Sequence, residues 1–115
     1  MSNMINSCSG FKLIYVIVEA GRGSYIMKSA RKAGADGGTI YYGRGTSIHE
    51  HGKFLGVPIE PEKEVVMILI KENLANEVFA AVVKDGELET PGKGIAFILD
   101  VSNVAGICHL ENDSK

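Results

Sequence analysis

The sequence predicts a small α+β domain in which two helices pack on one mainly antiparallel sheet. Three observations favour this fold class: short runs of branched and aromatic residues, two amphipathic segments with helical spacing, and glycine-rich breaks between them. At 115 residues the chain suits one domain, which we expect to span residues 1–115. We expect loose ends at about 1–9 and 111–115, and a long loop at about 43–63.

The first half of the chain predicts a strand, a helix and a second strand. Residues 11–18, FKLIYVIV, are short and rich in branched side chains, as strands are. The segment YIMKSARKA follows with helical spacing. We expect the Ser24 hydroxyl to cap its first turn and Gly34 to end it. GGTIYY then begins the second strand.

The second half of the chain predicts a third strand, a second helix and a fourth strand. EVVMILI (residues 64–70) is a third strand, and NLANEVFAAVVKDG is a second helix that we expect Asn73 to cap and Gly86 to end. IAFILDV is a fourth strand, and VAGICHL predicts a short edge strand. The order strand, helix, strand, strand, helix, strand is the split βαβ, ferredoxin-like arrangement, with both helices on one face of the sheet.

The predicted strands are apolar on both faces. In the first strand, Leu13, Tyr15 and Ile17 alternate with Ile14, Val16 and Val18, and the third and fourth strands are similar. Two helices cover only one face, and each buried aliphatic side chain contributes roughly 1.5–3 kcal/mol. We therefore expect the second face to pack against other subunits. The alternative is a half-exposed sheet with a few apolar surface residues.

Composition narrows the class of protein. The net charge of −2 argues against a general nucleic-acid binder, and no apolar run is long enough to span a membrane or to act as a secretory signal. Two cysteines, Cys8 and Cys108, are too few for a disulfide framework and form no CxxC pair. We therefore expect a reduced, cytoplasmic protein.

Two glycine-rich turns are the candidate binding elements. Glycine lets backbone amides converge on an anion, and a neighbouring Arg or Lys neutralises its charge. Neither turn has the GxxxxGK[ST] pattern of a P-loop, and without further context each is also compatible with a plain turn. The residues concerned are Gly43, Arg44, Gly45 and Thr46 in the first, and Thr90, Pro91, Gly92, Lys93 and Gly94 in the second.

The chain resembles the nitrogen regulatory protein P-II family over most of its length. The resemblance rests on KAGADGGTIYYGRG and on TPGKGIAFILDV, in that order and separated by a long loop. It implies a homotrimer with inward-facing sheets, and clefts between subunits that bind ATP, ADP or AMP, often with 2-oxoglutarate. The implied ligand-binding residues are Gly43, Arg44, Gly45, Thr46, Thr90, Gly92, Lys93 and Gly94.

The resemblance also implies a mode of action. Residues 43–63 would be the T-loop, which docks onto a membrane transporter or a metabolic enzyme in nitrogen regulation and signal transduction. An extended hairpin arm is the structural alternative, because KFLGVPIE is apolar.

This chain departs from the family pattern in three places. VAGICHLE contains none of the arginines that usually grip phosphates, Ile95 stands where lysine is common, and the loop has no match to the modified tyrosine motif. Each lost cation removes charge-assisted contacts of about 1.5–3 kcal/mol. Either Lys93 and Arg44 compensate, or the effector is a different nucleotide or a smaller anion.

Two other classes of function remain open. His49 and His51 alternate around Glu50 and, with His109 or a second subunit, could hold a transition metal, as in the trimeric copper-tolerance family of similar fold. They also suit solvated loop positions. Arg22 invites comparison with acylphosphatases, but no asparagine occurs between Gly37 and Lys71 to orient water, so Arg22 fits a connecting turn better. No residue set predicts catalysis, and we expect a protein that is not an enzyme.

Overall fold

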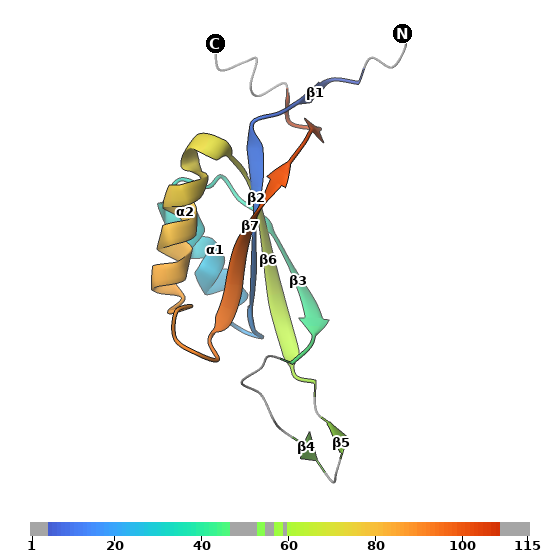
Figure 1. Ribbon diagram of the computed structural model, residues 1–115, viewed down its shortest axis with the longest axis vertical. Coiled ribbons are helices and arrows are strands. Elements are labelled where there is room, and N and C mark those ends of the chain that lie inside the picture. The colour runs from blue at the N-terminus through green and yellow to red at the C-terminus, as the bar shows by residue number, and fades with distance from the viewer. Residues whose placement is uncertain (1–4, 47–52, 55–56, 59, 109–115) are drawn as a thin grey trace.

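The fold is one four-stranded antiparallel sheet with two helices on one of its faces (Figure 1). The computed structural model describes residues 5–46, 53–54, 57–58 and 60–108. The central strands lie in the order β3-β6-β2-β7. Their bounds are β2 Phe11–Glu19, β3 Thr39–Arg44, β6 Glu62–Lys71 and β7 Gly94–Val101, and the helices are α1 Gly23–Lys32 and α2 Glu72–Asp85. The predicted ferredoxin-like fold is confirmed.

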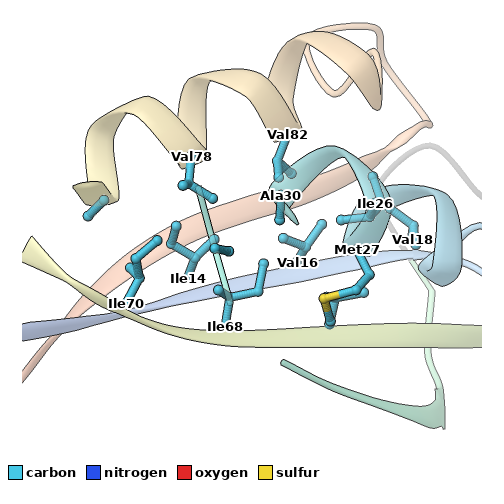
Figure 2. Packing of buried hydrophobic residues seen from close by; sticks show 13 residues of the cluster. Ile14, Val16, Val18, Ile26, Met27, Ala30, Ile68, Ile70, Val78 and Val82 are labelled. Atoms are coloured by element: carbon cyan, nitrogen blue, oxygen red, sulfur yellow. The ribbon is translucent and has the colours of Figure 1, made fainter. Parts of the chain in front are cut away.

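The core lies between the sheet and the helices. The register aligns Ile14 of β2 with Ile68 of β6 and Ile98 of β7, so alternate residues of each strand share one face. Figure 2 shows Ile14 and Ile68 on the side of the sheet that faces Val78 of α2 and Ala30 of α1. The fully buried members are Ile14, Val16, Val18, Ile26, Ala30, Val66, Ile68, Ala75, Val78 and Val82.

The other face of the sheet, which we call the open face, is apolar, and neither α1 nor α2 lies on it (Figure 1). The register gives its members as Leu13, Tyr15, Ile17, Tyr41, Val65, Met67, Leu69, Ile95, Phe97 and Leu99. Ile95 is 54% exposed and Leu99 is 46% exposed. Apolar residues therefore occupy both faces of these strands, as the sequence predicts.

The predicted helix caps are wrong at both N-termini. Ser24 lies inside the first turn of α1, whose N-cap is Arg22, and Asn73 lies inside α2, whose N-cap is Lys71. Neither N-cap residue makes a side-chain capping bond. The free amides find partners far along the chain instead: Gly23 N donates to Glu64 Oε1 at 2.5 Å, and Glu72 N donates to the Gly10 carbonyl at 2.9 Å.

The predicted helix ends agree better with the structure. Gly34, at φ +125°, follows the last turn of α1 directly after its C-cap Ala33, and Gly86 is the C-cap of α2.

Two short ladders lie at opposite ends of the central sheet (Figure 1). At one end, β4 (Lys53–Phe54) pairs with β5 (Val57–Pro58), inside the segment for which the sequence predicts a long loop or a hairpin arm. At the other, β1 (Ser7–Cys8) pairs with β8 (Val104–Ala105).

A disulfide joins Cys8 to Cys108, with the two Cα atoms 5.8 Å apart. This corrects the expectation of free thiols. Within the predicted loose N-terminal segment, Ser7 and Cys8 pair with Ala105 and Val104; that the ends of the chain are loose stays a prediction. Neither helix in the described residues is long and apolar enough to span a membrane.

Candidate functional site

A cavity of about 710 Å³ opens at the end of the sheet where β2 and β3 finish and β6 and β7 begin. Two glycine-rich segments lie at its rim. Residues 43–46 are the end of β3 and the two residues after it, and we keep the name β3 turn for them although Gly43 and Arg44 are paired in the strand. Residues 90–94 are the β7 turn. All eight predicted ligand-binding residues line this one cavity within a single chain, namely Gly43, Arg44, Gly45, Thr46, Thr90, Gly92, Lys93 and Gly94. That they bind a ligand stays a prediction.

Local backbone hydrogen bonds stabilise the β7 turn. The Thr90 amide donates to the Glu87 carbonyl at 3.0 Å, and the Lys93 amide donates to the Thr90 carbonyl at 3.2 Å. Gly92 has φ +87° and Gly94 has φ +140°, which side-chain-bearing residues rarely adopt. A Cβ on Gly94 would lie 2.6 Å from the Ile17 carbonyl oxygen. Glycine there lets the turn lie directly against β2.

The β3 turn continues the pairing between β3 and β6. Gly43 lies opposite Lys63, and the Gly45 amide donates to the Pro61 carbonyl at 3.2 Å. A Cβ on Gly43 or Gly45 would have no atom within 4 Å, so neither glycine is required by packing in the described chain.

The floor of the cavity is the end of the open face. Ile17 of β2 is aligned with Val65 of β6 and Ile95 of β7, and all three line the cavity. Three cationic side chains (Arg44, Lys63 and Lys93) and two acidic ones (Glu19 and Glu89) complete the lining, with a net charge of plus one. An apolar floor with a few polar groups at the rim is typical of a small-molecule site.

Sequence patterns alone missed half of this lining. Ile17, Glu19, Lys63 and Val65 belong to strands, and Leu88 and Glu89 precede the β7 turn, so none falls in a glycine-rich motif. The signal that could have found them is alternation. Residues 17 and 19 are the last open-face positions of β2, and residues 63 and 65 are the first open-face positions of β6, which lies beside it.

An aromatic row crosses the open face beside the cavity. The Tyr15 and Phe97 rings stack with centroids 5.2 Å apart, and the Tyr15 hydroxyl is hydrogen-bonded to the Tyr41 hydroxyl. That hydrogen bond is the main cause of the raised pKa of Tyr41, with partial burial second.

The other candidate residues gain less from the structure. His49 and His51 lie outside the described residues, so the metal hypothesis stays a prediction. Among the described residues, no group of three or more His, Cys, Asp or Glu side chains could hold a metal ion. Arg22, the N-cap of α1, donates from its guanidinium to the Gly86 carbonyl at the C-terminus of α2, at 3.4 Å.

Comparison with known proteins decides the family. The profile of the family "Nitrogen regulatory protein P-II" matches residues 11–109. The chain belongs to the P-II family.

The fold agrees with that assignment. A crystal structure of Arabidopsis thaliana PII bound to citrate is similar, with a TM-score of 0.63 and 22% sequence identity. The match covers 82% of this chain and 79% of the plant chain. No curated protein matches the sequence. Members of the P-II family are signalling proteins. That this chain is not an enzyme stays a prediction.

Proposed function

We propose that this P-II protein is a homotrimeric signal-transduction protein that binds a small anionic effector in the cavity and regulates a transporter or an enzyme. One observation carries the proposal. The two glycine turns, each with a cationic residue, border the same cavity although 43 residues (47–89) lie between them in sequence, and the floor of that cavity is the end of the open apolar face. Citrate on the plant PII shows that a protein of this fold can hold an organic anion.

The open face supports the trimer. Its exposed side chains include Phe97, Leu99 and Ile95, and covering them removes apolar area from water. In a trimer with inward-facing sheets the cavity would lie at the border between subunits, so a neighbour could add groups to it.

The loop between β3 and β6 supports the regulatory role. The β3 turn is both a wall of the cavity and the beginning of that loop. An effector that contacts Arg44 or Thr46 would favour some loop conformations over others, and would shift their populations by its difference in affinity for them. The cytoplasmic location that the sequence predicts stays a prediction, and the Cys8–Cys108 disulfide is of a kind that is rare in that compartment, where thiols are kept reduced.

Calorimetric titration tests the proposal. The panel is ATP, ADP, AMP, cyclic nucleotides, 2-oxoglutarate, citrate and bicarbonate. We expect at least one to bind, and Arg44→Ala and Lys93→Ala each to weaken it by about tenfold or more, because each removes a charge-assisted contact. Lys28→Ala, an exposed lysine on α1 away from the cavity, is the matched control. If no member of the panel binds, the proposal fails.

A further inference from the structure

The Cys8–Cys108 disulfide lies outside both faces of the central sheet. The β1–β8 ladder beside it is at one end of that sheet (Figure 1), and in the described chain its two strands pair only with each other. Neither cysteine belongs to the buried cluster between the sheet and the helices, and neither is a member of the open face. The disulfide can therefore open while the core and the open face keep their contacts.

The chain is anchored where the ladder meets the sheet. The Gly10 carbonyl accepts a hydrogen bond from the Glu72 amide at 2.9 Å. Phe11, the first residue of β2, is 7% exposed, and the register places it between Lys71 of β6 and Val101 of β7. These contacts keep β2 in the sheet, whereas a ladder of two residue pairs has little stability of its own. Cutting the disulfide therefore releases only the residues before Gly10 on this side of the ladder.

The two sulfur atoms differ in access. Cys108 is 3% exposed, whereas Cys8 is partly exposed. Thiol–disulfide exchange begins when a thiolate attacks one sulfur of the pair, and access helps to decide which sulfur is attacked. Cys108 Sγ also lies 3.1 Å from the Val104 carbonyl oxygen. A Cys108 thiol in that position can donate a hydrogen bond to the carbonyl, so the buried cysteine has a partner once the bond is cut.

We propose that the disulfide is a modification site at which a small thiol of the glutathione class attacks Cys8. The incoming thiolate forms a bond to Cys8 Sγ while the bond from Cys8 Sγ to Cys108 Sγ breaks. The electron pair of the broken bond leaves with Cys108, which then takes a proton from water. The product is a mixed disulfide at Cys8 and a free thiol at Cys108.

A second thiol molecule completes the reduction. Its thiolate attacks the thiol's own sulfur in the mixed disulfide, and Cys8 leaves as a thiolate. Two thiol molecules are thereby oxidised to one disulfide, and the protein disulfide accepts two electrons and two protons. In reducing compartments, disulfides are usually transient or redox-sensing, which suits the cytoplasmic location that the sequence predicts. The proposal goes beyond the proposed function and does not depend on effector binding.

Peptide mapping tests the site of attack. The oxidised full chain, without effector, is incubated with reduced glutathione, and free thiols are then blocked with N-ethylmaleimide. Trypsin separates the two cysteines, because cleavage after Lys12 and Lys93 gives residues 1–12 and 94–115. Among singly glutathionylated chains, we expect the glutathionyl group on residues 1–12 at least about five times as often as on residues 94–115. An equal or reversed distribution overturns the proposal, and so does a disulfide that glutathione does not open.

The dependence on urea tests whether the folded protein reacts. Below the unfolding transition, the rate of glutathione exchange should change by less than about twofold, because the attack needs only local opening. A rate that rises with urea in parallel with global unfolding overturns the proposal. S-Methylglutathione, which has no thiol, should leave the disulfide intact. The Cys8→Ser/Cys108→Ser variant should gain no mass with glutathione, and a gain there would mean that the adduct does not report on the disulfide.

Discussion

Glu64 is a buried carboxylate with a structural task. Its side chain, on β6, accepts a hydrogen bond from the Gly23 amide at the first position of α1. A carboxylate there satisfies a free amide and lies at the positive end of the helix dipole. A strand residue 41 positions away in sequence therefore caps the N-terminus of α1.

Removal of this carboxylate should destabilise the protein. We expect Glu64→Ala to lower the free energy of unfolding by about 1–3 kcal/mol, because the Gly23 amide loses its buried acceptor. Gly23→Ala should also destabilise, since its Cβ would lie 2.5 Å from Glu64 Oε1. Urea unfolding measures both effects. Glu62→Ala, which removes an exposed carboxylate from the same strand, is the control. If Glu62→Ala lowers the free energy of unfolding as much as Glu64→Ala does, the capping role is contradicted.

The Lys12–Asp100 ion pair gives a pH dependence with a definite sign. The Nζ to Oδ1 distance is 2.5 Å. The hydrogen bond and charge of Lys12 lower the pKa of Asp100, and the same hydrogen bond and the Asp100 charge raise the pKa of Lys12. The Asp100 contribution to stability is therefore complete above its unfolded pKa of about 3.9 and is lost as pH falls through its lower folded value. The Lys12 contribution is complete below about pH 10.4 and is lost as pH rises through its raised folded value.

We expect Asp100→Asn to lower the urea midpoint slightly at neutral pH, and the difference from wild type to shrink in acid. Asp100 is exposed and Lys12 is partly exposed, so the effect should also decrease with salt. A difference that grows as pH falls below 4 would contradict the assigned sign.

At the scale of the elements, one serine links the two helices. Ser29 of α1 is buried, and its hydroxyl lies 2.6 Å from Asp85 Oδ2 and 3.2 Å from the Ala81 carbonyl, both on α2. We expect Ser29→Ala to cost about 1 kcal/mol of unfolding free energy. Ser24→Ala, in the exposed first turn of the same helix, should change it by less than about 0.5 kcal/mol, because Ser24 is not the cap. Thermal unfolding of both variants measures the contrast, and equal losses would contradict it.

The elements themselves were predictable because local patterns determine them. Branched residues in β2 and β6 and the helical spacing in α1 and α2 give the correct order, and Gly34 and Gly86 mark the helix ends. The helix starts were not predictable, because Glu64 and Gly10 act from distant parts of the chain. The same distinction between local and distant determinants applies to the cavity. Its glycine turns appear as motifs, whereas Glu19, Lys63 and the floor become neighbours only through the strand register.

At the scale of the whole molecule, the open face should control assembly. We expect the wild-type chain to sediment as a trimer and Phe97→Glu to shift it to smaller species, since a charge in an apolar interface is unfavourable. Tyr25→Glu, which alters an exposed aromatic residue on α1, should leave the mass unchanged. Circular dichroism must show that Phe97→Glu is folded, because Phe97 also stacks on Tyr15. A wild-type protein that sediments as a single chain at high dilution would contradict the proposed trimer.

The Cys8–Cys108 disulfide lies at the end of the central sheet opposite the cavity. It links Cys8 of β1 to Cys108, which follows β8 in the chain, over a sequence separation of 100 residues. The strands β1 and β8 pair only with each other in the described chain. A cross-link over so long a loop restricts the unfolded chain, so its loss should lower the free energy of unfolding by about 2–5 kcal/mol. A two-stranded ladder this short is not stable alone. Reduction should therefore also release the N-terminal strand from residues 104–105, while the four-stranded sheet and the cavity at its other end persist.

Urea unfolding with and without dithiothreitol, compared with the Cys8→Ser/Cys108→Ser variant, measures this contribution. The reductant should lower the midpoint of the wild type to that of the variant and leave the variant unaffected. On reduction of the disulfide, the amides of β1 and β8 should exchange hydrogen faster, and the protection of amides in β2 and β6 should not change. Because the cavity is bordered by β2, β6 and the glycine turns, effector affinity should be the same in both redox states. A change in effector affinity on reduction would mean that the two ends of the sheet are coupled. If mass spectrometry verifies the disulfide in the wild type and its urea midpoint still equals that of the double variant, the stabilising role is contradicted.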